Sequence, residues 1–172
     1  MAAPVENVGR RHFLRGRGGK RNNALRLPWV KSEAVFLEQC NQCVDCINAC
    51  ETNIIKVDDS GFPIIDFKED ECTFCGKCEE VCQQPLFIEQ SERLTQNIKP
   101  WPALFNINDK CFAKNNVYCQ SCQDVCDARA ITFKFIDSAI PEPDLNLSAC
   151  NQCGACVSVC PQQAILATKI ET

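Results

Sequence analysis

The stretch from Cys150 to Cys160, Cys-Asn-Gln-Cys-Gly-Ala-Cys-Val-Ser-Val-Cys, places four cysteines at the spacing C-x2-C-x2-C-x3-C. The same spacing occurs twice more, and a further run widens its first gap to seven residues. The four runs are Cys40-Cys43-Cys46-Cys50 (run one), Cys72-Cys75-Cys78-Cys82 (run two), Cys111-Cys119-Cys122-Cys126 (run three) and Cys150-Cys153-Cys156-Cys160 (run four). They hold all 16 cysteines of the 172-residue chain. Four thiolates at this spacing bind a [4Fe–4S] cluster, so the sequence predicts four such clusters.

Two other uses of cysteine fit the sequence less well. Structural zinc sites usually have two close pairs of cysteines separated by a longer insert, often with histidine, and the only histidine here is His12. A disulfide framework belongs in a secreted protein. The basic N-terminus is not followed by the apolar segment of a secretory signal, and no segment is long and apolar enough to span a membrane. We therefore expect a soluble, cytoplasmic protein.

Charge is unevenly distributed along the chain. Residues 1–31 carry a net charge of +7 and the remaining residues carry −11. Each oxidised cluster with its four thiolates adds about −2 to the acidic part. An acidic body repels nucleic acid, so we expect the basic segment to contact a protein partner or the chain's own body. Few aliphatic residues remain for a core once the cysteines are assigned to metal, so we expect the clusters to take its place.

The order of the segments predicts an α+β protein built from a repeated unit. A basic arm (1–31) precedes two bacterial 2[4Fe–4S] ferredoxin-like modules, at 32–90 and 103–172, joined by a linker at 91–102. Ser32 is expected to cap a short helix over 33–38. Apolar segments bounded by turn residues predict two pairs of strands, over 53–57 and 63–67 and over 130–135 and 144–147. The fourth cysteine of each run is expected in the first turn of a short helix.

The paired runs resemble those of two-cluster ferredoxins, in which the fourth cysteine of one run binds the cluster of the other. The resemblance implies that each cluster joins two distant segments of the chain. The implied ligands are Cys40, Cys43, Cys46 and Cys82 for cluster I; Cys72, Cys75, Cys78 and Cys50 for cluster II; Cys111, Cys119, Cys122 and Cys160 for cluster III; and Cys150, Cys153, Cys156 and Cys126 for cluster IV. The widened first gap of run three makes cluster III the one that we expect to be labile.

The segment Arg10-Arg11-His12-Phe13-Leu14-Arg15 resembles a twin-arginine export signal, but glycine and basic residues follow it where a working signal is apolar. Together with Leu27-Pro28-Trp29 and the widened run three, it resembles the ferredoxin-type proteins associated with periplasmic nitrate reductase. This resemblance implies a cytoplasmic iron–sulfur protein that binds the catalytic subunit of that reductase before its export, and that assists cluster assembly or supplies electrons. The residues implied in partner binding are Arg10, Arg11, Phe13, Leu14 and Trp29.

No catalytic residues are expected, because the sequence has no nucleotide-binding loop and no nucleophile motif apart from the cysteine runs. Two alternatives to a maturation factor stay open. The protein could be a general polyferredoxin that carries electrons between soluble or membrane partners. In the other alternative the clusters only hold the fold together, and function then does not depend on their reduction potentials.

Overall fold

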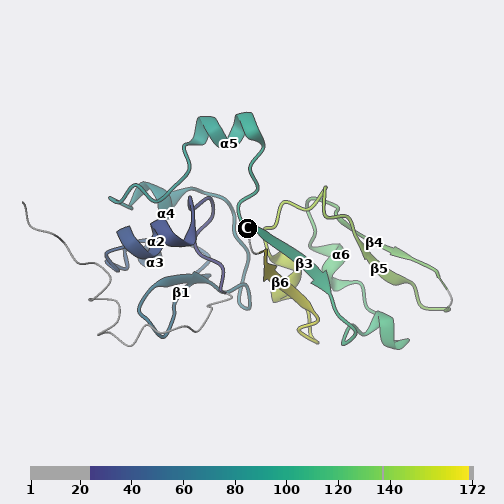
Figure 1. Ribbon diagram of the computed structural model, residues 1–172. Helices are drawn as coiled ribbons and strands as arrows, with labels where there is room; N and C mark the ends of the chain where they lie inside the picture. Colours follow the sequence, from purple (N-terminus) through teal and green to yellow (C-terminus); the bar gives the residue numbers. More distant parts are fainter. Residues whose placement is uncertain (1–23, 137, 171–172) are drawn as a thin grey trace, which may run out of the picture.

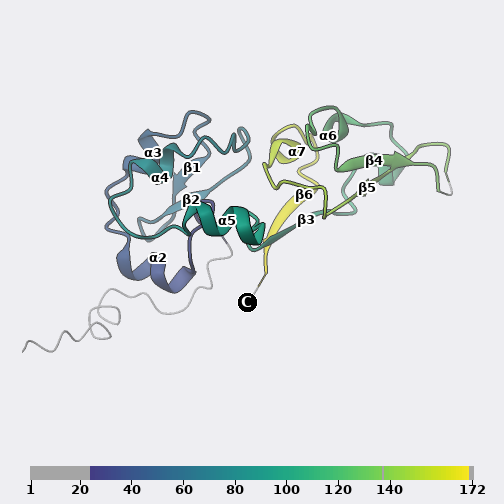
Figure 2. The same cartoon turned by 90° about the horizontal axis from the view of Figure 1, so that it is seen from above.

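The computed structural model describes residues 24–136 and 138–170, so most of the expected basic arm lies outside it. The chain forms two lobes that lie side by side in both views (Figures 1 and 2). We call the lobe that contains runs one and two the first module, and the lobe that contains runs three and four the second module. Small helices and short antiparallel strand pairs make up both modules, in agreement with the expected α+β class.

The two expected strand pairs are present. Three of their strands are shorter than the sequence indicates, and the fourth has the expected length at a shifted position. β1 (Ile55–Val57) pairs with β2 (Pro63–Ile65), and β4 (Ile131–Lys134) pairs with β5 (Glu142–Leu145). Both pairs are antiparallel. β5 begins and ends two residues before the segment expected for it, because its pairing with β4 runs from Lys134 opposite Glu142 to Ile131 opposite Leu145.

A third strand pair was not expected from the sequence. β3 (Ala103–Ile107) pairs antiparallel with β6 (Ile165–Lys169), so the first and last strands of the second module lie together. In β3 the buried side chains of Ala103 and Phe105 alternate with exposed ones. This period of two residues is the ordinary pattern of a half-buried strand.

Each cysteine run contains a four-residue helix. These helices are α3 (Asp45–Asn48), α4 (Lys77–Glu80), α6 (Ser121–Asp124) and α7 (Ala155–Ser158). The third cysteine of each run lies in the helix and the fourth follows just after its end, so the expected place of the fourth cysteine was wrong. Helices this short do not hold together alone in water, so they depend on tertiary contacts and bound groups.

Three further elements connect these units. α2 (Glu33–Gln39) is capped by Ser32, whose hydroxyl oxygen accepts a hydrogen bond of 3.2 Å from the backbone N–H of Val35, as expected. α5 (Gln90–Gln96) covers the first half of the expected linker and projects above the first module in Figure 1. The 3-10 turn η1 (Ala113–Asn115) fills the widened gap of run three.

The core runs continuously from one module into the other. Phe67 of the first module packs at right angles to Trp101, with ring centroids 5.4 Å apart, and also contacts Phe105 of the second. Leu25 and Leu27 are buried in the same core. The last residues of the expected arm therefore form part of the folded body.

Candidate metal centres

The three runs with regular spacing share one backbone conformation. In each, the last residue of the first gap and the first residue of the second gap adopt a left-handed conformation. These residues are Gln42 and Val44, Phe74 and Gly76, and Gln152 and Gly154. Two such residues on either side of a cysteine make the chain curl tightly, so that a single loop can present three thiols to one centre. Val44, with φ of 64°, is β-branched, and this conformation costs such residues of order 1–3 kcal/mol.

Backbone N–H groups are directed at several cysteine sulfurs. Gln152 donates to the Sγ of Cys150 at 3.4 Å. In the second module, the N–H of Ala130 reaches Cys126 Sγ and the N–H of Ala164 reaches Cys160 Sγ, each at 3.3 Å. Hydrogen bonds to sulfur stabilise negative charge and are one way in which proteins set the potential of an iron–sulfur cluster.

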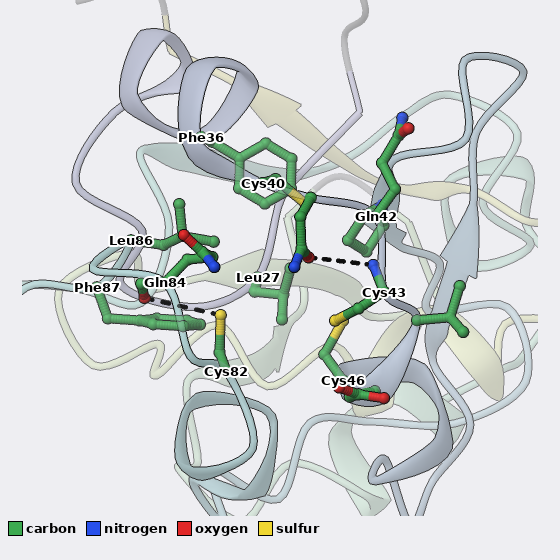
Figure 3. A pocket seen from close by; sticks show the side chains of 14 residues that line it. Leu27, Phe36, Cys40, Gln42, Cys43, Cys46, Cys82, Gln84, Leu86 and Phe87 are labelled. Carbon is green, nitrogen blue, oxygen red and sulfur yellow. Dashed lines mark hydrogen bonds between the residues drawn. The ribbon is translucent and has the colours of Figure 1, made fainter.

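The structure gathers the side chains of the expected cluster I around one pocket. Cys40, Cys43 and Cys46 come from run one and Cys82 comes from run two, as Figure 3 shows. The apolar side chains that complete the lining are Leu27, Phe36, Leu86 and Phe87. The site is therefore built from remote segments of the first module and closed by its core.

The other three expected ligand sets are also brought together. Cys111, Cys119, Cys122 and Cys160 line a second pocket, with Phe112, Phe133 and Ile165 beside them. Two further groups are close enough for their thiolate charges to act on one another: Cys50, Cys72, Cys75 and Cys78 in the first module, and Cys126, Cys150, Cys153 and Cys156 in the second.

The third cysteine of each run has a strongly raised pKa in the metal-free chain. Burial, and next the charge of a neighbouring thiolate, raises the pKa of Cys46 and Cys122 to about 11 and that of Cys78 and Cys156 to about 12. Thiols with such raised pKa values stay protonated at pH 7 unless positive charge beside them stabilises the thiolate. A coordinating metal supplies it and displaces the protons, which is the behaviour expected of a metal-ligand set.

The cysteines of each set are spaced for an iron–sulfur cluster and not for a single metal ion. Within residues 24–136 and 138–170, no three His, Cys, Asp or Glu side chains come close enough together to hold a single metal ion. A [4Fe–4S] cube does not require such closeness, because each of its four thiolates binds a different iron atom.

The widened gap of run three is an ordered turn. The side-chain amide of Asn115 donates to the carbonyl oxygens of Asp109, at 2.7 Å, and of Cys111, at 2.8 Å. Lys114 donates to the carbonyl oxygen of Ile107 at 2.7 Å. Cys111 is itself buried, so these hydrogen bonds fix a ligand that lies against the core of the second module.

The residues implied in partner binding fall in two places. Arg10, Arg11, Phe13 and Leu14 lie outside the described residues. Trp29 is described, and it has partners inside the protein: its indole N–H donates to the carbonyl oxygen of Ile98 at 3.0 Å, and its ring packs on Phe74 and under Arg93. In the part of the chain that the structure describes, no helix has the length and hydropathy to cross a membrane.

Comparison with known proteins covers both modules. The 4Fe–4S dicluster domain family matches the chain twice, over residues 39–84 and 117–164. The chain is 42% identical over 161 residues to the ferredoxin-type protein NapF of Escherichia coli, and the alignment covers 94% of each protein. It is 40% identical over 171 residues to NapF of Haemophilus influenzae, again over 94% of each. A ferredoxin of Methanothermococcus thermolithotrophicus is 39% identical over 53 residues, which are 30% of this chain and 85% of that protein.

Proposed function

The chain belongs to the NapF family of ferredoxin-type iron–sulfur proteins, and we propose that it binds four [4Fe–4S] clusters and acts in the cytoplasm on the catalytic subunit of a periplasmic nitrate reductase before that subunit is exported. When bound, each cluster can accept and return one electron. The chain's own part is to hold sixteen thiolates and to direct backbone N–H groups at some of their sulfurs. We propose no catalytic role for any side chain.

The proposed ligand sets are the four crossed groups. The observation that carries them is the convergence of three cysteines from one run with the fourth cysteine of another, as at Cys82 beside Cys40, Cys43 and Cys46. The shared left-handed loops and the N–H···S hydrogen bonds support the same assignment. Anaerobic analysis is expected to give about sixteen iron and about sixteen acid-labile sulfide per chain. A colourless protein that contains zinc would contradict the assignment.

The maturation role is supported by the family and by the basic segment that precedes the folded body. The experiment is anaerobic co-purification of the loaded protein with the unexported precursor of the catalytic subunit. A deletion of residues 1–23 is the informative variant, because Leu25 and Leu27 beyond it are buried in the core. We expect the full chain to retain the precursor, and the deletion variant and the variant Arg10→Ala/Arg11→Ala to retain much less. If the full chain, with its iron present, fails to bind the precursor, the maturation role is wrong.

One structural feature favours the alternative of an electron carrier. The two modules meet through their cysteine runs, where the backbone of Cys72 contacts that of Cys153, and a factor that only transfers clusters has no need of such a junction. Four clusters that are reduced reversibly and exchange electrons would favour the carrier. A cluster that moves to an iron-free acceptor protein would favour the maturation factor.

A further inference from the structure

We propose, on the basis of the four-cluster ligation above, that the clusters stand in a single row in the order I–II–IV–III, and that electrons cross between the modules from cluster II to cluster IV at the contact between Cys72 and Cys153. Neither the cysteine spacing nor the family match indicates how two dicluster modules are joined. The order comes from contacts between named cysteines.

The junction between the modules is a direct contact between ligands. The backbone N–H of Cys72, a ligand of cluster II, donates a hydrogen bond of 2.8 Å to the carbonyl oxygen of Cys153, a ligand of cluster IV.

The links inside each module use the helices of the runs. Cys46 on α3 binds cluster I, Cys78 on α4 binds cluster II, and the two helices contact each other. In the second module, Cys122 on α6 binds cluster III and Cys156 on α7 binds cluster IV, and these two helices are in contact in the same way. Clusters I and III are therefore at the two ends.

Gly154 allows the close approach of the modules. It lies beside Cys153 in run four, and a Cβ atom placed on it would lie 2.1 Å from Cδ1 of Phe67 in the first module. Gly76 occupies the equivalent place in run two, with a similar φ of +78°, and a Cβ atom there would meet nothing within 4 Å. The need for glycine at position 154 thus has a second cause besides the left-handed backbone. Gly154 is a positioning residue for the junction.

The transfer step is a one-electron exchange. A reduced cluster II loses one electron and becomes oxidised, and an oxidised cluster IV gains that electron and becomes reduced. No bond forms or breaks and no proton moves. The first electron comes from a low-potential one-electron reductant, and dithionite serves in the experiment.

The test compares two variants of the full chain, each of which keeps one cluster from each module. The inner-pair variant keeps clusters II and IV and carries Cys40→Ala, Cys43→Ala, Cys111→Ala and Cys119→Ala. The outer-pair variant keeps clusters I and III and carries Cys75→Ala, Cys78→Ala, Cys150→Ala and Cys156→Ala. Both are reduced with dithionite and examined by low-temperature EPR. The inner pair is expected to show the broadened, split spectrum of two interacting spins, and the outer pair the simple sum of two isolated clusters.

The iron content separates this proposal from the one on which it depends. About eight iron per chain in both variants confirms that two clusters are present, and an isolated-cluster spectrum from the inner pair then overturns the order alone. Missing iron in the wild-type protein would instead overturn the ligation.

If the two-cluster variants do not fold, Gly154→Ala and Gly76→Ala are compared with all sixteen cysteines kept. The spin coupling between the modules is expected to weaken in Gly154→Ala, to stay near that of the wild type in Gly76→Ala, and to recover in Gly154→Ala/Phe67→Ala. Equal spectra from both glycine variants would overturn the proposed junction.

Discussion

Trp101 donates its indole N–H to the backbone carbonyl oxygen of Arg26, at a distance of 2.7 Å. The side chain of Trp101 is 2% exposed, so water cannot replace this hydrogen bond. Trp101→Phe keeps most of the ring and leaves the carbonyl oxygen of Arg26 without this donor. We expect the free energy of unfolding to fall by about 1–3 kcal/mol, which is the usual cost of leaving a buried polar group unpaired. Anaerobic denaturant unfolding of the loaded protein measures it.

Trp29→Phe is the matched control. Its indole N–H also donates to a backbone carbonyl oxygen, that of Ile98 at 3.0 Å, but Trp29 is only partly buried. Water can reach this carbonyl after the substitution, so the loss is expected to stay below about 1 kcal/mol. A larger loss of unfolding free energy at Trp29 than at Trp101 would show that burial does not make the Trp101 hydrogen bond the more important of the two.

Arg26 carries a buried positive charge between two carboxylates. Its guanidinium contacts Glu33 at 2.8 Å and Asp58 at 3.0 Å, and it lies 4.9 Å from the ring centre of Phe36. Arg26→Met removes this buried charge and its contact with Asp58, whose side chain is 6% exposed. We expect a loss of about 3–5 kcal/mol at pH 7, as is usual when one member of a buried pair is removed. The exposed pair of Lys56 and Glu69 is the control, and Lys56→Met should cost less than about 1 kcal/mol.

The pH dependence of this stabilisation has a definite sign. Burial acts to raise the pKa of Asp58, but the backbone N–H of Phe62 and the Arg26 guanidinium lower it further than burial raises it, and the net pKa is lowered. A lowered pKa in the folded state stabilises the protein above the ordinary pKa of aspartate, and this contribution is lost as the pH falls through the lowered value. The stabilisation that comes from the lowered pKa of Asp58 is therefore fully present at pH 7. Adding Asp58→Asn to Arg26→Met should recover part of the lost free energy of unfolding at pH 7. If nothing is recovered, the negative charge of Asp58 does not cause the destabilisation in Arg26→Met.

Removal of iron is expected to unfold most of the body. Each of the four helices in the cysteine runs has four residues and carries one proposed ligand, and a helix of this length has almost no stability alone. Anaerobic chelation should reduce the helical circular dichroism signal and abolish cooperative unfolding, and re-addition of iron and sulfide should restore both. If the iron-free protein unfolded with an unchanged midpoint, the clusters would have no part in holding the fold.

The cysteine spacing predicts more of the site than of the fold. It indicates that each run supplies ligands to a cluster, and the resemblance to two-cluster ferredoxins implies the crossed grouping of the four ligand sets, which stays a prediction. It does not indicate β3 and β6. Four of the five residues of Ala103–Ile107 are apolar, so the sequence lacks the alternation that the burial of the side chains shows. The fourth cysteine was wrongly expected in the first turn of a helix. In run one the helix begins earlier, after the left-handed residue Val44, so that it contains the third cysteine, and nothing in the composition indicates this start.

The junction between the modules could not be predicted from sequence. The hydrogen bond from Cys72 to Cys153 joins residues 81 positions apart. In the sequence only Gly154 is related to it, and Gly154 does not reveal the junction, because Gly76 has a similar backbone conformation although a Cβ atom there would meet nothing within 4 Å. The sequence places the segment 25–30 in the basic arm, because residues 1–31 are basic, rich in glycine and without apolar periodicity. It folds into the body because Leu25 and Leu27 are apolar and because Arg26 finds carboxylate partners.

Asn115 is expected to protect cluster III. Its side-chain amide donates to the carbonyl oxygens of Asp109 and Cys111, and these hydrogen bonds hold the start of the widened gap of run three in a turn around Cys111. Asn115→Ala removes both hydrogen bonds and should expose Cys111 and Cys119. On exposure to air the variant is expected to lose about four of its about sixteen iron atoms before the rest, and these two cysteines should react first with an alkylating reagent.

The wild-type protein is expected to show a different order of reaction. Cys43 and Cys75 are exposed whereas Cys111 is buried, so clusters I and II should be attacked before cluster III despite the unusual spacing of run three. Asn106→Ala, on the exposed side of β3, is the control and should leave that order unchanged. If Cys111 reacts before Cys43 in the unaltered chain, then the hydrogen bonds of Asn115 do not protect the cluster, and the long first gap of run three makes cluster III labile after all.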